Sequence, residues 1–70
     1  MASPHATLSC KDDGWAFELL RHLKESHEVD LRDFDLAVHG RFCQGLAREY
    51  DMVAYYDPNY DTMRFFKPVA

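Results

Sequence analysis

The spacing of hydrophobic residues changes near Asp51, and this change constrains the fold more than any other feature of the sequence. Before it, apolar side chains recur every three or four residues, as they do on one face of a helix. After it, residues 52–56 and 62–67 are rich in aromatic and β-favouring types. Between these two runs, residues 57–61 have the residue types of a tight turn, in which Pro58 presets φ. The pattern predicts helices followed by a C-terminal β-hairpin.

The first helical segment carries a single apolar stripe. Trp15 and Leu19 lie on this stripe, which predicts a helix over residues 14–26. Asp12 and Asp13 precede the stripe and are of a residue type that caps the first amides of a helix.

The segment between this helix and the hairpin fits two periods. Residues 29–31 alternate and predict a short extended piece, whereas residues 33–50 follow helical spacing. Gly40 lies inside that helix and costs about 1 kcal/mol relative to alanine in a helix interior. Two shorter helices, at 32–38 and 41–50, are therefore an alternative.

The predicted fold class is α+β, with two or three helices packed on a small antiparallel sheet that includes the hairpin. We expect residues 12–70 to form a single compact domain, because a chain of 70 residues has room for one core only. Residues 1–11 are expected to be a flexible tail. The N-terminus has neither the basic start nor the apolar run of a signal peptide. Two cysteines are too few for a disulfide scaffold, so we expect a cytoplasmic or nuclear protein without a membrane partner.

Charge is unevenly distributed along the chain. Residues 11–35 contain eight acidic and four basic side chains, whereas residues 36–70 contain four of each. An acidic surface disfavours phosphate backbones and favours basic partners. Asp30, Asp33 and Asp35 are the residues that we expect to contact a basic protein surface.

One pair of residues has the spacing of a metal or catalytic site. His39 and Cys43 are four residues apart and share one face of a helix. Structural zinc sites draw their ligands in two such pairs, and this chain has one. A substrate cleft of several hundred Å³ is also hard to build in a chain that needs a core. We therefore expect a non-catalytic protein with no metal, no cofactor and no small-molecule substrate.

The hairpin turn resembles the start of a calcium loop. Asp57, Asn59 and Asp61 match the first three ligand positions. The pattern then fails, because Thr62 stands where glycine is needed and Pro68 where a bidentate glutamate is needed. A tight turn is the better interpretation.

The second half of the chain contains the candidate nucleic-acid-binding residues. Tyrosine and phenylalanine rings of the hairpin lie near basic side chains in the sequence, as in proteins that stack single-stranded bases. About half of these rings must point into the core, because alternate strand residues face opposite sides of a sheet. We expect Tyr55, Met63 and Phe65 to be mainly core. The basic and polar residues that we expect to form one binding face are Arg41, Gln44, Arg48, Arg64 and Lys67.

Residues 45–52 (GLAREYDM), with the later run RFFK at 64–67, resemble the R-three-H domain. The resemblance covers about the last thirty residues. It implies a small α/β domain that binds single-stranded nucleic acid, with a helix followed by two strands. At the positions of the family's signature Arg and His this chain has Gly40 and Gln44.

The order of elements is also similar to that of a winged helix. In that reading the helix at 41–50 is the recognition helix, and the hairpin at 55–66 is the wing. Winged helices bind either DNA or proteins. The alternative function is therefore an acidic protein-interaction module, a subunit or inhibitor that docks on a basic partner surface.

Overall fold

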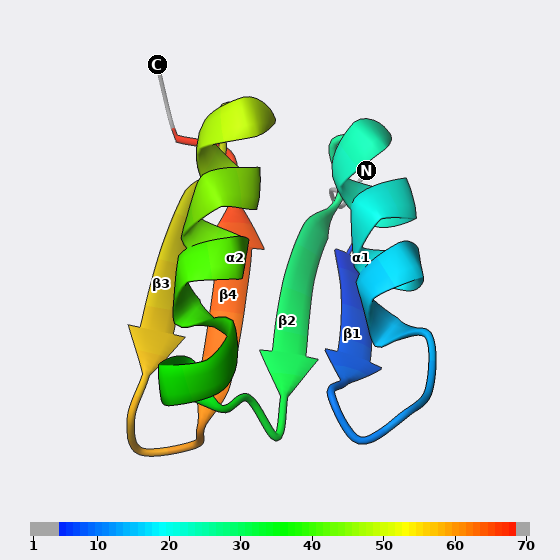
Figure 1. Cartoon of the computed structure of the whole chain (residues 1–70). Coiled ribbons are helices and arrows are strands. Elements are labelled where there is room, and N and C mark those ends of the chain that lie inside the picture. Colours follow the sequence, from blue (N-terminus) through cyan, green and yellow to red (C-terminus); the bar gives the residue numbers. More distant parts are fainter. Residues whose placement is uncertain (1–4, 69–70) are drawn as a thin grey trace.

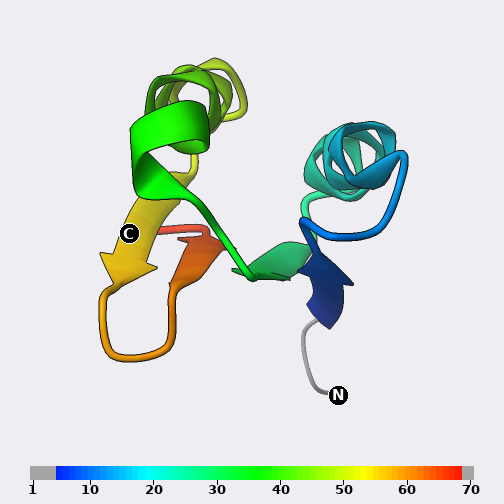
Figure 2. The same cartoon turned by 60° about the horizontal axis from the view of Figure 1, so that its bottom comes forward.

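The computed structural model describes residues 5–68. The elements follow in the order β1 (His5–Ser9), α1 (Trp15–Lys24), β2 (Glu28–Arg32), α2 (Leu36–Glu49), β3 (Val53–Asp57) and β4 (Thr62–Phe66). The four strands form one sheet, and both helices cover the same face of it (Figures 1 and 2). The α+β class and the C-terminal hairpin, β3–β4, are confirmed.

The sheet is mixed, and the expected antiparallel sheet is wrong in this respect. The strand order is β1-β2-β4-β3. β1 and β2 pair in parallel, whereas β4 pairs antiparallel with both β2 and β3. The parallel pair arises because α1 carries the chain back along the sheet, so that β2 starts at the same end as β1.

The expected flexible tail over residues 1–11 is wrong for the part that the structure describes. His5–Ser9 is β1, an edge strand, and residues 1–4 lie outside the described residues. Ala6 and Leu8 pack against the core, and the backbone pairs with β2 from His5↔Glu28 to Ser9↔Arg32. Pairing with a distant strand stabilises this segment, whose own sequence gives only a weak strand signal.

α1 begins at Trp15 without an aspartate cap. Its N-cap is Gly14, which has a φ of 79°, and no side chain caps the first turn. The expected capping by Asp12 and Asp13 is therefore wrong. Gly14 occupies the left-handed region, which glycine adopts at no steric cost.

α2 is continuous from Leu36 to Glu49, so the alternative of two helices with a break at Gly40 is wrong. The Asp35 carboxylate caps its start and accepts a hydrogen bond from the Val38 N–H at 3.3 Å. Gly40 is buried together with Cys43 and other side chains of the same face. Burial of that apolar face outweighs the helix-propensity cost of one glycine.

The core lies between the sheet and the two helices. Its buried residues come from both helices, the central strands and two loops: Leu19, Leu23, Val29, Leu31, Phe34, Cys43, Leu46, Ala47, Met52, Met63 and Phe65. Met63 and Phe65 are core residues as predicted, but Tyr55 is 58% exposed. In β3 the residues that turn toward the helices are Ala54 and Tyr56, so Tyr55 faces the other way. Within residues 5–68, neither helix has the length and apolar composition needed to cross a bilayer.

Candidate functional site

The predicted nucleic-acid-binding residues do not share one face. Arg41, Gln44 and Arg48 are exposed on α2, where their spacing places them along one stripe. Arg64 lies on β4 and points to the open face of the sheet, where it contacts Asp30, whereas α2 covers the opposite face. Lys67 follows β4 and is exposed. The expectation of a single cationic face is therefore wrong.

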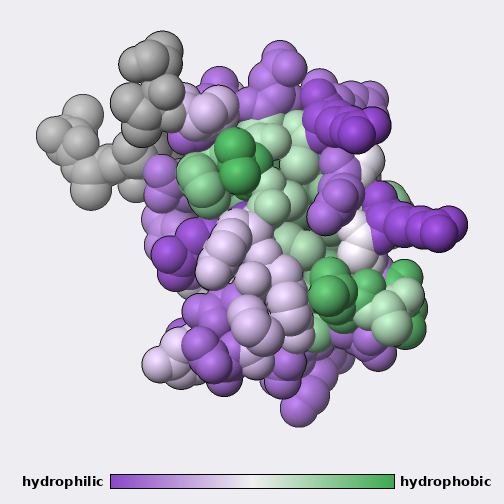
Figure 3. Space-filling view, turned by 90° about the vertical axis from the view of Figure 1, so that its left-hand side faces the viewer, coloured by the Kyte–Doolittle hydropathy of each residue, from purple (hydrophilic) through white to green (hydrophobic). Residues whose placement is uncertain are grey.

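The side of the molecule where β3 and α2 lie has both hydrophilic and hydrophobic residues at its surface (Figure 3). Among the described residues, no carboxylate oxygen lies within 4.0 Å of a guanidinium nitrogen of Arg41 or Arg48. Separate hydrophobic patches interrupt this side of the molecule. Exposed apolar side chains on α2 are Leu36, Val38 and Phe42.

The open face of the sheet contains an ion-pair network centred on Asp30. Arg64 donates from Nε to Asp30 Oδ1 at 2.9 Å, and His5 Nε2 lies 3.2 Å from Asp30 Oδ2. The Asp30 side chain is only 15% exposed, whereas that of Arg64 is 61% exposed. Asp30 is therefore held within the protein by its neighbours on two strands.

A hollow of about 500 Å³ lies on this face, beside the β3–β4 turn. Its lining combines carboxylates, guanidinium groups and aromatic rings: Asp30, Arg32, Asp33, Tyr55, Asp57, Tyr60, Thr62 and Arg64. Tyr55 and Tyr60 are 58% and 77% exposed, so their rings are accessible to a partner. The hollow thus offers aromatic faces next to three carboxylates and two guanidinium groups.

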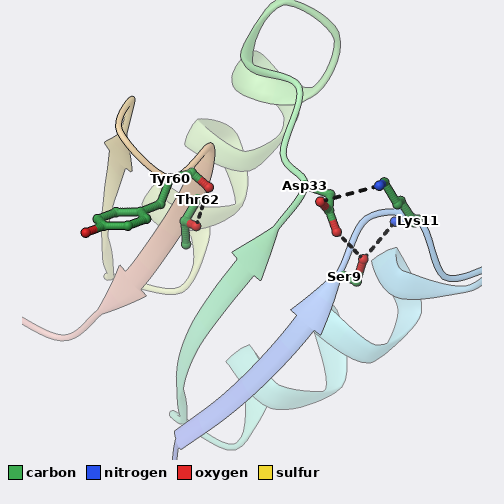
Figure 4. A network of polar contacts seen from close by, with 5 residues as sticks. All are labelled: Ser9, Lys11, Asp33, Tyr60 and Thr62. Carbon is green, nitrogen blue, oxygen red and sulfur yellow. Dashed lines mark hydrogen bonds and ion pairs between the residues drawn. The ribbon is translucent and has the colours of Figure 1, made fainter.

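Asp33 is fixed at one edge of the hollow (Figure 4). The Ser9 hydroxyl donates to its Oδ2 atom at 2.8 Å, and Lys11 Nζ lies 3.7 Å from Oδ1. Across the hollow, the Thr62 hydroxyl donates to the Tyr60 carbonyl at 3.0 Å. Hydrogen bonds therefore hold both edges of the hollow in place.

The hollow borders one strongly acidic end of the molecule. The β1–α1 loop, the β2–α2 loop and the β3–β4 turn meet at this end, at the bottom of Figure 1. We call this region the acidic end; its charged residues are Lys11, Asp12, Asp13, Arg32, Asp33, Asp35, Asp57 and Asp61. Asp33 and Asp35 belong to it, whereas Asp30 lies on the sheet face.

The negative charge of the acidic end affects the pKa of Tyr56. Its hydroxyl donates to Asp61 Oδ1 at 2.8 Å. This hydrogen bond is the largest cause that raises the pKa of Tyr56, followed by burial and by the charges of Asp61, Asp35 and Asp57. Three carboxylates therefore raise the pKa of the same phenol, as expected where negative charges lie close together.

The Asp57–Asp61 segment forms a turn, as predicted, and the carboxylates of Asp57 and Asp61 accept hydrogen bonds from neighbouring residues. Asp57 Oδ1 accepts a hydrogen bond from the Asn59 N–H at 2.9 Å, and Asp61 holds the Tyr56 hydroxyl. Sequence reasoning missed the hollow itself. The sequence does contain one sign of it. Tyr55 and Asp57 are two residues apart in β3, so their side chains lie on the same face of the sheet.

His39 and Cys43 do not form a reactive pair. Cys43 is fully buried, and this burial, with a smaller contribution from Cys10, raises the pKa of its thiol to about 12. The His39 ring instead packs on Trp15 and Phe34, with ring centroids 5.0 and 6.0 Å apart. A thiol with so high a pKa is protonated at neutral pH, which disfavours nucleophilic or metal-binding chemistry.

Comparisons with protein-family profiles, curated proteins and solved structures found no match to this chain.

Proposed function

We propose that this chain is a small, non-catalytic protein-interaction domain that binds a basic segment of a partner protein. The observation that carries the proposal is the hollow, where the exposed rings of Tyr55 and Tyr60 lie with the carboxylates of Asp33 and Asp57. An arginine or lysine side chain is attracted both to the face of an aromatic ring and to a carboxylate.

The surrounding charges support the same kind of partner. Two of the residues that line the hollow are cations, Arg32 and Arg64, and Arg64 pairs with Asp30. The acidic end adjoins the hollow and contains six aspartates and two basic residues, Lys11 and Arg32. Such a concentration of one sign of charge attracts an oppositely charged partner during encounter and speeds its association.

A peptide titration tests this function. The full chain is titrated with a labelled arginine-rich peptide and with a glutamate-rich peptide of the same length, at low and at physiological salt. The basic peptide is expected to bind and to bind more weakly as salt rises, because solvent-exposed charges are screened. Asp33→Asn and Tyr60→Ala are each expected to weaken binding roughly three- to tenfold.

Asp51→Asn is the matched control. It removes one aspartate that follows α2 at the other end of the molecule, and like Asp33 this residue has a φ of 55°. The control is expected to retain wild-type affinity. Absence of basic-peptide binding at low salt, or an equal loss in Asp33→Asn and Asp51→Asn, would show that the proposed function is wrong.

A second candidate is binding of single-stranded nucleic acid, as the resemblance to the R-three-H domain implies. The α2 stripe favours it, because Arg41 and Arg48 are exposed with Gln44 between them. Cations without a nearby carboxylate are available to phosphate groups, and such contacts give strongly salt-dependent binding.

Labelled single-stranded and duplex oligonucleotides at two salt concentrations distinguish this candidate from the first. Arg41→Glu is expected to abolish oligonucleotide binding if α2 is the binding face. Arg21→Glu on α1 is the control, because Arg21 is also exposed but already pairs with Glu18. Binding of the basic peptide with no oligonucleotide binding at low salt would exclude the second candidate.

A further inference from the structure

A cluster of two histidines and a glutamate lies at the end of α1 that is remote from the acidic end. His22, Glu25 and His27 each offer one ligand atom, and these three atoms all lie within 4.8 Å of one another. Within residues 5–68, no other group of three or more His, Cys, Asp or Glu side chains meets this condition. We propose that these three residues bind one zinc ion.

The end of α1 builds the cluster. The His27 N–H bonds to the His22 carbonyl at 3.0 Å, and the Ser26 N–H bonds to the Leu23 carbonyl at 3.0 Å. These two bonds form a Schellman motif, which folds His27 back over the last turn of the helix. Glycine is the usual residue at the left-handed position of this motif, but here it is Ser26, with a φ of 61°. The backbone alone therefore brings the two imidazoles together.

The two rings face each other through the same type of nitrogen. His22 Nδ1 and His27 Nδ1 are 3.0 Å apart, and the ring centroids are 5.2 Å apart. Two nitrogens bound to one tetrahedral zinc are roughly 3.3 Å apart, given Zn–N bonds of about 2.0–2.1 Å. Without a metal, one Nδ1 must carry a proton and the other must accept it. When zinc binds both Nδ1 atoms, the proton of the donor ring moves to the Nε2 atom of that ring by exchange with solvent, so both imidazoles stay neutral.

The Glu25 carboxylate and a water molecule supply the remaining two ligands of the proposed site. Glu25 Oε2 lies 3.4 Å from His27 Nε2, which is not the ring nitrogen that faces His22, so the Glu25 side chain has to rotate to reach an ion bound at the two Nδ1 atoms. The Glu25 side chain is 57% exposed and that of His27 is 23% exposed, so solvent reaches the ion from one side. Two imidazoles, one carboxylate and a water are a donor set that suits zinc. Magnesium and calcium prefer oxygen ligands throughout.

The test is a zinc titration of the full, reduced, chelator-treated chain, followed by native mass spectrometry and calorimetry. We expect one zinc per chain. His22→Asn and His27→Asn are each expected to weaken binding at least about tenfold, because each removes one of only three protein ligands. His39→Asn and Cys10→Ser are the controls and should retain wild-type affinity.

A second readout does not depend on any variant folding correctly. In the wild-type chain, zinc should shift the imidazole NMR signals of His22 and His27 and leave those of His5 and His39 unchanged. Cobalt(II) in place of zinc should give the visible absorption of a tetrahedral ion without a thiolate charge-transfer band. No zinc binding to the wild-type chain, unchanged binding in the His22→Asn/His27→Asn double variant, or loss of binding in Cys10→Ser would each overturn the proposal.

Discussion

Arg64 and Asp30 are direct partners across β4 and β2, and the Arg64 Nε atom donates to Asp30 Oδ1 at 2.9 Å on the open face of the sheet. A cross-strand pair of opposite charges stabilises a sheet, and screening by solvent limits the gain when one partner is exposed. In a double-mutant cycle of Arg64→Met and Asp30→Asn, we expect a coupling free energy of about 0.5–1 kcal/mol. Urea unfolding measures it, and a coupling of zero would mean that the pair does not contribute.

Asp35 is expected to stabilise the start of α2. Its carboxylate accepts the Val38 N–H, so Asp35→Ala should lower the free energy of unfolding by about 1 kcal/mol. Asp13→Ala is the matched control at the start of α1, where no side chain caps the helix. Thermal and urea unfolding should show almost no change in the control, and equal losses in the two variants would contradict the assigned cap.

Gly45 is a position where the chain can be stabilised. It is exposed within α2, and a Cβ atom added there would meet nothing within 4 Å. Gly45→Ala should therefore raise the free energy of unfolding by about 0.5–1 kcal/mol. Gly14→Ala is expected to do the opposite, because its φ of 79° is unfavourable for a residue with a Cβ. Denaturant unfolding of both variants tests the two signs together.

The two cysteines should differ in their reactivity toward a thiol reagent. Cys43 is fully buried and its pKa is raised to about 12, so at pH 8 it should react only after unfolding. Cys10 is partly buried, and its pKa is raised by burial and by the charge of Asp33. It should react in the folded chain, more slowly than a free thiol. Cys10→Ser should remove the reaction that occurs in the folded chain. Only the reaction of Cys43 should then remain, and its rate should increase with denaturant concentration.

Alkaline pH should weaken the contribution of Tyr56 to stability. The hydrogen bond to Asp61 raises the pKa of Tyr56 in the folded chain, whereas in the unfolded chain a tyrosine ionises near pH 10. The folded state then binds more protons, so stability falls as pH rises above about 10. The Tyr56→Phe variant lacks the ionisable hydroxyl and serves as the reference. The stability difference between wild type and Tyr56→Phe should be constant from pH 7 to 9 and decrease above pH 10.

The sequence predicts the elements whose stabilising contacts are local. Trp15 and Leu19 repeat with helical spacing, and the turn residues at 57–61 mark the hairpin, so both elements are found close to their expected bounds. β1 is different, because His5–Ser9 becomes a strand through parallel pairing with β2 across an intervening helix. No local pattern encodes that partner.

The candidate site divides in the same way. The sequence shows Asp33 and Asp35 as acidic residues, but their proximity to Asp57 and Asp61 depends on three loops that lie at one end of the sheet. Conversely, Arg41 lies on α2, which covers one face of the sheet, whereas Arg64 contacts Asp30 on the other face, and a list of basic residues does not show this. The His22–His27 contact depends on the left-handed backbone of Ser26, a conformation that is unusual for serine.

β4 is the last strand of residues 5–68 but lies between β2 and β3 in the sheet. Until residues 62–66 are in place, the two halves of the molecule have no shared backbone ladder, and Val29 and Leu31 lack the partners Phe65 and Met63. Folding is therefore completed from the C-terminal side, after synthesis of nearly the whole described chain. A nascent or cleaved polypeptide that lacks this strand exposes apolar core surface. It is therefore expected to aggregate or to be bound by chaperones and degraded by proteases, and not to fold as a shorter domain.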